Sequence, residues 1–535
     1  MSYETFASTL PSRIASLVHA HFEALPARNK PRIHSDDVRE HSEWIPMTGI
    51  VAVKGENTAL ENLTCISVTS GAKCLSASHI PRCKGLVLHD CHAEILAIRA
   101  FNYWLLTECR SVLSREKRLS NGDGTFSSDY HEIADSPFIQ RRSIQEYEDA
   151  STSPTKWPPF ALRPDIKIYM YCTCAPCGDA SMELCMAAQE DATPWEVSRQ
   201  EGTPSVDAEG PPTTETLLDG RAHFSRLGVV RRKPARMDAE STRSKSCSDK
   251  LALRQVSSLL SCETSRLVAP TENAYLAGLI LPEDEISRVG FDRSFGENGR
   301  MKALKGRTWP VDTKAAERIP GYQFRPFEVL SVPSEEIAAV WRFGKPKALP
   351  RNASASVANA KKSRPGNVSA VWTVAPSYQD PSTVLVDTGS KALPNLCRSR
   401  TGLHETIING VKQGNRASSP RARGASALSR AKLWALFRDV VSVADAHIDH
   451  NAPLSVTSLS NASGVEELDA NESQRLAPGP VTYREFKEPS SSQDPLQIRI
   501  QAIGDAKAVL QGWIPNTGDE DWSLNDLVDS KKRKL

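Results

Sequence analysis

Apolar and polar positions along the chain follow helical periods in some segments and strand periods in others. Apolar residues recur at helical spacing over residues 3–25 and predict an amphipathic helix. Residues 49–54 and 63–75 predict β-strands, the second with a turn at Ser70-Gly71. Residues 92–106 are strongly apolar and predict a helix.

Later segments continue this mixture of helices and strands. Residues 166–173 predict a buried strand, and residues 177–186 predict another helix. Strands and helices in this order are typical of an α/β layer. The C-terminal half predicts helices at 248–260, 427–446 and 497–512, and strands at 277–281, 370–373 and 383–387.

Polar stretches rich in Ser, Pro, Thr, Asn and charged residues separate these segments. Such a composition cannot bury enough apolar surface to offset the entropy lost on folding. We therefore expect disordered insertions at about 113–160, 187–222, 345–368, 411–428 and 449–480. The remainder predicts a single domain over residues 1–535, with its core at about 45–530.

Composition limits the class of protein. Of the 535 residues, 39% are hydrophobic and 35 are prolines, which indicates a folded core interrupted by polar loops. The formal net charge of +2 excludes a general polycation, so a nucleic-acid partner would need a local basic patch. No feature of the sequence indicates an obligate protein partner.

The chain has the features of an intracellular protein. It contains no run of about 18 apolar residues, and the N-terminal MSYETFASTLPSR lacks the layout of a secretory signal. We expect the nucleus, the cytoplasm or both, and the basic tail SKKRKL is either an import signal or a solvated end. The 12 cysteines are therefore interpreted as free thiols or metal ligands.

Three short segments at predicted helix starts carry candidate chemistry: CHAE (91–94), APCGDA (175–180) and SCSDK (246–250). Zinc deaminases combine an H-x-E segment with two cysteines, and their glutamate is a general acid/base that does not bind the metal. His92 and Glu94 have this spacing. We therefore assign Zn²⁺ to His92, Cys177 and Cys247, with Glu94 as the general acid/base.

The spacing departs from the common P-C-x-x-C pattern, because Ala180 stands where the second cysteine is expected. Cys247 must then supply the third ligand from far downstream. Cys174 is the rival ligand, but strand alternation places it on the same face as Cys172. Both are better interpreted as core thiols.

The motifs HDCHAE, PCGDAS and SCSDK, in this order, resemble the catalytic domain of the eukaryotic RNA adenosine deaminases. That family comprises the double-stranded RNA editing enzymes and the tRNA-specific deaminases. Further similar segments are SVTSGAKCL (67–75), RRKPARMDAESTRSKSCSDK (231–250), AVWT (370–373), TIINGVKQGNRA (406–417), ASALSRAKLWALF (425–437), TYREFKE (482–488) and GWIPNTGDEDWSL (512–524). The resemblance implies a three-layer, cytidine-deaminase-like α/β core with extra C-terminal helices. It also implies conversion of adenosine to inosine in RNA.

Within that family the tRNA branch fits best. The editing enzymes carry double-stranded RNA-binding domains of about 65–70 residues ahead of the catalytic domain, and we expect no room for one before His92. The resemblance then implies deamination of adenosine 37, beside the anticodon of alanine tRNA. Editing of double-stranded RNA is the first alternative, and a non-catalytic, zinc-containing RNA-binding protein is the second.

A basic segment precedes the third candidate ligand. Residues 221–254 hold ten Lys or Arg against three Asp or Glu, a net of +7. We expect phosphate contacts from Arg231, Arg232, Lys233 and Arg236. Lys73 is a further candidate, because the family's corresponding segment lies near the bound nucleotide.

The resemblance also implies a buried inositol hexakisphosphate. Residues matched to its cage are Arg99, Lys250, Tyr483, Lys487, Lys507 and Trp513. The chain departs from the editing enzymes at Leu253 and Arg254, where those enzymes have Arg and Trp, and at Asn516, where a lysine is expected.

Overall fold

The computed structural model describes residues 9–36, 39–121, 136–142, 158–188, 218–219, 226–233, 240–310, 321–345, 364–378, 399–448, 481–490 and 496–525. The insertion expected at 449–480, the strand expected at 383–387 and the basic tail lie outside these residues. Most of the insertions expected at 113–160, 187–222 and 345–368 also lie outside them.

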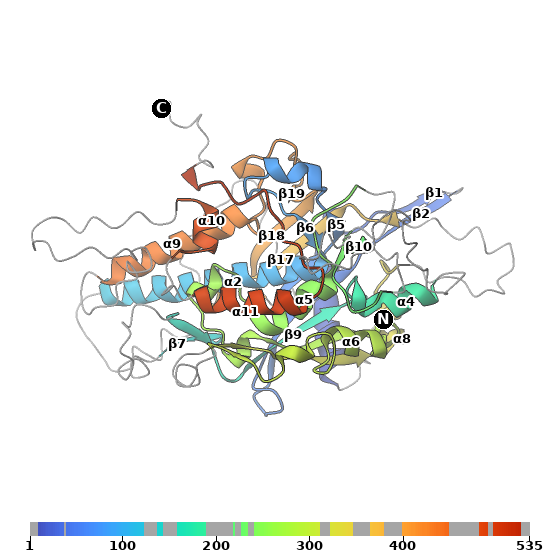
Figure 1. Ribbon diagram of the computed structural model, residues 1–535, viewed down its shortest axis with the longest axis horizontal. Coiled ribbons are helices and arrows are strands. Elements are labelled where there is room, and N and C mark those ends of the chain that lie inside the picture. The colour runs from blue at the N-terminus through green and yellow to red at the C-terminus, as the bar shows by residue number, and fades with distance from the viewer. Residues whose placement is uncertain are drawn as a thin grey trace, which may run out of the picture.

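An eight-stranded sheet forms the centre of the molecule (Figure 1). Its two contacts among β15, β12 and β9 are parallel, and all contacts from β9 through β3 to β19 are antiparallel. The strand order is β15 (Glu328–Val332), β12 (Leu276–Pro282), β9 (Ile166–Cys172), β3 (Met47–Lys54), β4 (Asn62–Ser70), β17 (Val368–Val374), β18 (Thr401–Ile408) and β19 (Val411–Lys412).

Helices cover both faces of this sheet. On one face, α1 (Leu10–Ala24) and α8 (Ser334–Val340) share an apolar cluster with alternate residues of β3 and β9. On the other face, α2 (Ala93–Asn121) and α5 (Cys247–Ser257) pack against the remaining residues of the same strands. These layers confirm the predicted three-layer α/β core.

The C-terminal helices add a further group beside α2. They are α9 (Arg430–Ile448), α10 (Tyr483–Lys487) and α11 (Leu496–Val509), and α9 runs along α2 in Figure 1. The short helices α4 (Met182–Ala187) and α6 (Arg288–Phe295) lie at the other end.

The small sheets are formed by β1 (Ile33–Asp36), β2 (Arg39–Trp44) and β16 (Arg364–Pro365); by β5 (Ala72–Cys74) and β6 (Asp90–His92); by β7 (Ile139–Arg141) and β8 (Phe160–Leu162); by β10 (Leu218–Asp219) and β11 (Arg231–Arg232); and by β13 (Thr308–Trp309) and β14 (Tyr322–Gln323).

Two expected boundaries are corrected by the structure. The helix expected at 177–186 begins later, with a 3-10 turn at Asp179–Ser181 followed by α4, so Cys177 precedes the helix instead of opening it. The helix expected at 92–106 continues to Asn121, into the first expected insertion.

The prediction of a disordered insertion at 411–428 is also wrong. These residues form β19, a turn and a 3-10 helix at Ala422–Gly424. The polar composition misled the prediction because a few buried groups fix the segment: Leu428 lies in an apolar cluster, and Ser426 Oγ donates to Glu405 at 2.6 Å.

None of the described helices combines the length and apolar character needed to cross a bilayer.

Candidate metal centre

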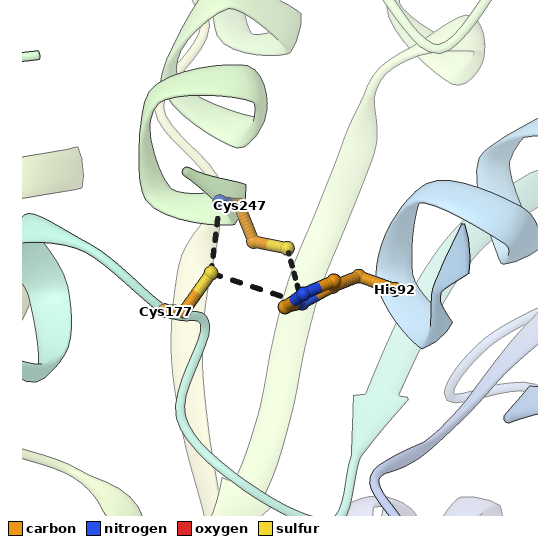
Figure 2. Close-up of side chains that lie close together, drawn as sticks. All are labelled: His92, Cys177 and Cys247. Atoms are coloured by element: carbon orange, nitrogen blue, oxygen red, sulfur yellow. Dashed lines mark hydrogen bonds between the residues drawn. The ribbon is translucent and has the colours of Figure 1, made fainter. Parts of the chain in front are cut away.

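Three segments far apart in the sequence bring His92, Cys177 and Cys247 together (Figure 2). His92 ends β6, Cys177 lies in the loop after β9, and Cys247 opens α5. Their possible ligand atoms all lie within 4.8 Å of one another. His92 Nδ1 is 3.8 Å from Cys177 Sγ and 3.6 Å from Cys247 Sγ, so one cation can contact all three.

Local backbone structure fixes the two thiols. Ser246 caps α5 by accepting the Asp249 N–H at 3.1 Å, and the Cys247 N–H, in the first turn of the helix, donates to Cys177 Sγ at 3.4 Å. Gly178 has φ +109°, and a Cβ there would overlap the Ser246 side chain. The loop therefore reaches the start of α5 only because residue 178 is glycine.

Buried charges surround the cluster. Lys233 Nζ donates to Cys247 Sγ at 3.3 Å and to Asp90 Oδ2 at 2.8 Å, and Asp90 Oδ1 accepts the His92 N–H at 3.0 Å. Lys250 Nζ also binds Asp90. A chain of contacts thus runs from the cysteine through Lys233 and Asp90 to Lys250.

The pKa values of Cys177 and His92 shift toward their charged forms, whereas burial and the neighbouring Cys177 raise that of Cys247. The Cys247 thiol, with Lys233 and His92, holds the pKa of Cys177 well below its usual range despite burial. Burial and Lys233 disfavour a charged imidazole at His92, but nearby thiolates outweigh them and raise its pKa to about 10. A bound metal ion would replace that proton.

Glu94 stands beside this cluster in the first turn of α2. It is 3% exposed, and its Oε2 has no hydrogen-bond partner among the described residues. Burial raises the pKa of its carboxyl group above the ordinary value. A buried carboxyl with a free oxygen is suited to exchange a proton with a bound reactant.

Two buried ion pairs hold the cysteine segments. Asp179, two residues after Cys177, accepts Arg293 Nε at 3.0 Å. Asp249, two residues after Cys247, accepts Arg300 Nη1 at 2.6 Å. Both arginines lie in or just after α6, and no sequence motif pointed to them because they are more than 40 residues from either cysteine.

The rival cysteines lie elsewhere. Cys172 is buried on the α2 side of the sheet and contacts Thr48 Oγ1 at 3.3 Å, which confirms a core thiol. Cys174 is half-buried and does not belong to the His92 cluster among the described residues.

Burial corrects part of the predicted substrate surface. Arg231 is buried, and its guanidinium donates to the Arg226 carbonyl. Lys233 is buried against Asp90 and Cys247, so neither side chain faces solvent where a phosphate could reach it. Arg232 is half-buried, and Arg236 lies outside the described residues. The charge count located the basic segment but could not tell which of its cations face inward.

A second site is a basic cavity of about 250 Å³ on the far side of Asp90. Arg99, Lys250 and Trp513 line it, as expected, together with Arg254 and Arg430. Burial lowers the pKa of Arg99, and burial and nearby arginines lower that of Arg254 to about 9. Cations with pKa values lowered in this way are stabilised by an anion.

The other residues expected at this cavity do not line it. Lys507 Nζ is 5.9 Å from the Trp513 ring, and burial lowers its pKa. Tyr483 is buried and stacks on Trp522, whereas Lys487 is exposed and pairs with Glu488. Asn516 Oδ1, at the position where a lysine was expected, accepts from Lys245 Nζ at 2.5 Å, so another cation reaches this place. Arg254 was missed because the chain departs from the editing enzymes at 253–254. Arg430 lies in the segment 425–437 that resembles the family, but it was not matched to the cage.

The three-layer fold, with an H-x-E segment at the start of α2, one cysteine in the loop after β9 and another at the start of α5, defines a deaminase domain. Comparison with known proteins narrows this class. Residues 67–133 and 140–392 match the adenosine-deaminase (editase) domain, and the chain belongs to that family.

Curated relatives fall in both branches of the family. The chain is 34% identical to tRNA-specific adenosine deaminase 1 of Schizosaccharomyces pombe, over 60% of this chain and 68% of that protein. It is 31% identical to tRNA-specific adenosine deaminase 1 of Saccharomyces cerevisiae, over 52% of this chain and 60% of that protein. It is 32% identical to double-stranded RNA-specific editase B2 of Rattus norvegicus, over 25% of this chain and 14% of that protein.

Proposed function

We propose that this protein is a hydrolytic deaminase that converts adenosine to inosine in tRNA. Similarity to the proteins named as tRNA-specific deaminases extends over 60% and 52% of this chain, against 25% for the double-stranded RNA editase. The extent of similarity therefore favours tRNA over duplex RNA. The substrate position suggested by the family resemblance is adenosine 37, next to the anticodon of alanine tRNA.

The observation that carries the proposal is the position of Glu94 beside the three candidate ligands. A site that served structure alone would have no use for a buried carboxyl with an unpartnered oxygen, because such a group costs free energy. The same observation disfavours a non-catalytic RNA-binding protein. The donor set of one imidazole and two thiols fits zinc and leaves a fourth position for a reactant.

His92, Cys177 and Cys247 would hold the zinc ion, which supplies the Lewis acidity that activates water at neutral pH. Glu94 accepts a proton from the attacking water and donates it to the purine ring. The new C–O bond forms at C6, and Glu94 then takes the proton of the new C6 hydroxyl and passes it to N6. The C6–N6 bond breaks, ammonia leaves and the C6 carbonyl of inosine remains. Lys233 and Asp90 hold Cys247 and His92 in place during these steps.

We propose that the basic cavity holds inositol hexakisphosphate, because its cationic lining suits a polyanion. Arg99, Lys250, Arg254 and Arg430 would face its phosphates, and Trp513 would cover one side. Without an anion, so many buried cations would repel one another. Because Lys250 and Lys233 share Asp90, the cavity and the candidate metal centre are joined by a short path of ion pairs.

The test uses total tRNA from cells that lack the protein. After incubation with the purified full chain, inosines are located by sequencing, and a long RNA duplex is treated in parallel. We expect a signal at adenosine 37 of alanine tRNA. Deamination of the duplex with no signal on tRNA would select the double-stranded RNA alternative, and silence on both would contradict an RNA deaminase.

A further inference from the structure

A second group of potential metal ligands lies apart from the His92 cluster. One potential ligand atom from each of Cys83, His89 and Asp519 lies within 4.8 Å of the others, and none of the three residues belongs to that cluster. Cys83 follows the 3-10 turn at Ala77–Arg82, His89 precedes β6, and Asp519 lies in the C-terminal segment after α11. The mechanism above uses none of these side chains.

Close packing of the turn at 83–86 against the C-terminal segment brings the three side chains together. The Gly85 N–H donates to Asp519 Oδ1 at 2.7 Å. Gly85 has φ +67°, and a Cβ there would overlap the Trp522 ring. Cys83 is fully buried, and the side chains of His89 and Asp519 are 11% and 2% exposed. A group bound between them would therefore be largely shielded from bulk water.

The orientation of the His89 ring indicates a shared third partner. His89 Nε2 is 2.9 Å from Asp519 Oδ2. The two atoms are nevertheless not aligned as a hydrogen bond, and neither ring nitrogen of His89 has a hydrogen-bond partner among the described residues. Buried polar atoms without partners are costly and call for an explanation. A nitrogen and an oxygen that lie side by side without bonding to each other are arranged as two ligands of one cation.

The donor set fits zinc. One thiol, one imidazole and one carboxylate are ligand types of Zn²⁺, whereas Ca²⁺ and Mg²⁺ take mainly oxygen ligands. The thiolate and the carboxylate would supply two negative charges, which balance a divalent cation in a buried place. Burial and Asp519 raise the pKa of the Cys83 thiol to about 12, so its proton is released only when a metal ion binds in its place.

Two neighbouring features could compete with a metal ion. Arg430 Nη1 is a cation beside Asp519, but it lies closer to the backbone carbonyl of that residue, at 3.0 Å, than to Oδ2, at 3.4 Å. His89 also borders the basic cavity, where we propose a polyanion. The Asp519 carboxylate would repel an anion beside Nε2, so this side of the ring suits a cation.

We propose that Cys83, His89 and Asp519 bind a Zn²⁺ ion of their own, whose role is structural. The ion would fix the C-terminal segment at Asp519 to the turn that leads into β6, the strand that ends at His92. The inference is independent of the proposed function, because it concerns neither RNA nor deamination.

The test counts zinc in the purified full chain and in single and double variants. Each protein is dialysed against metal-free buffer, and its zinc is measured by mass spectrometry. We expect about two zinc ions per wild-type chain and a loss of about one in Cys83→Ala or Asp519→Asn. Asparagine matches the size of Asp519 and can still accept the Gly85 N–H, so this variant changes the ligand with little change in packing. Cys247→Ala should lose the other zinc ion, and Cys83→Ala combined with Cys247→Ala should lose both.

Cys109→Ala is the matched control, because Cys109 is also a buried free thiol but belongs to no group of potential metal ligands among the described residues. It should keep the wild-type zinc content. A Cys109→Ala chain that loses as much zinc as Cys83→Ala, or zinc that neither Cys83→Ala nor Asp519→Asn lowers, would overturn the inference.

The same measurement separates this site from the candidate metal centre. A single zinc ion per wild-type chain that only Cys247→Ala removes would overturn the inference and leave the proposed function standing. A single zinc ion that only Cys83→Ala and Asp519→Asn remove would support the inference and contradict the candidate metal centre.

Discussion

Glu94 and Asp249 are both buried carboxylates near the candidate metal centre, but their partners differ. Asp249 accepts from Arg300, from Ser246 Oγ at 2.6 Å and from the Arg231 N–H at 3.0 Å. Glu94 keeps an oxygen without a described partner, and burial raises its pKa. Because its hydrogen-bonding capacity is used up, Asp249 is a structural group, whereas Glu94 can still take part in proton transfer.

Gly178→Ala tests how closely the Cys177 loop must approach α5. The residue has φ +109°, a conformation that costs an alanine roughly 1–3 kcal/mol, and the new Cβ would also overlap Ser246. We expect a lower free energy of unfolding in urea and weaker zinc binding in a chelator competition. An alanine variant that keeps wild-type zinc affinity would show that the loop reaches the cluster by another route.

At this scale the sequence predicted which candidate ligands lie together better than it predicted their surroundings. The H-x-E spacing and the two cysteine motifs identified His92, Glu94, Cys177 and Cys247, and the structure brings the three ligand candidates together. The direction in which Lys233 points could not be predicted, because a run of basic residues has the same sequence pattern whether its side chains face phosphate or a buried carboxylate.

Among the elements, α6 and the turn after it position the cysteine segments through Arg293 and Arg300. Arg300→Ala should lower the free energy of unfolding by roughly 3 kcal/mol or more, because it leaves the buried Asp249 carboxylate without its counter-ion. The Co²⁺-substituted protein should show a changed visible absorption spectrum, since Asp249 holds the Ser246 cap beside Cys247. Both quantities can be measured without turnover.

Lys305→Ala is the comparison for that change. Lys305 pairs with Glu297 at 3.1 Å in the same part of the chain, but both side chains are half exposed to solvent. Exposed pairs contribute about 1 kcal/mol or less. An Arg300→Ala chain no less stable than the Lys305→Ala chain, with an unchanged Co²⁺ spectrum, would contradict the positioning role.

Helix α1 carries two buried histidines that should make stability depend on pH. Burial lowers the pKa of His19 to about 3 and that of His21 to about 4, from 6.5. Below pH 6.5 both histidines become protonated in the unfolded state but stay neutral in the folded state. The free energy of unfolding therefore falls as pH falls toward 4. Above pH 6.5 this stability is fully present.

His21→Phe should remove one of the two groups that take up a proton when the chain unfolds in acid. His21 packs on Trp372 with ring centroids 4.6 Å apart, and neither ring nitrogen has a described hydrogen-bond partner, so an apolar ring fits the site. Between pH 6 and 4.5 the variant's unfolding free energy should fall less steeply, by up to about 1.4 kcal/mol per pH unit. Parallel pH profiles for the two proteins would contradict this account.

Strongly periodic elements were predicted from sequence, and weakly periodic ones were missed. The segments that became β3, β9 and α5 are buried along most of their length and carry a clear apolar pattern. Strand β18 was missed because most of its residues are only half-buried, and β15 lies at the sheet edge. The contact of β4 with β17 joins residues some 300 positions apart, which no local pattern encodes.

For the whole molecule, we expect the basic cavity between α2, α5 and the C-terminal segment to make stability depend on an anion. Unfolded chain refolded with inositol hexakisphosphate at 100 times its dissociation constant should gain about 2.7 kcal/mol of unfolding free energy. Uncharged inositol should have no effect. Arg254→Ala should reduce the gain, because Arg254 lines the cavity. Equal stability with and without the polyanion would contradict an anion site.

The measurement that tests the central claim most directly is single-turnover deamination of alanine tRNA by the wild-type chain and by Glu94→Gln, with zinc measured in both. The account predicts equal zinc contents and a rate for the variant that is lower by roughly 10²–10⁴-fold, the usual contribution of a general acid/base. A Glu94→Gln chain that holds zinc and forms inosine at the wild-type rate would contradict it.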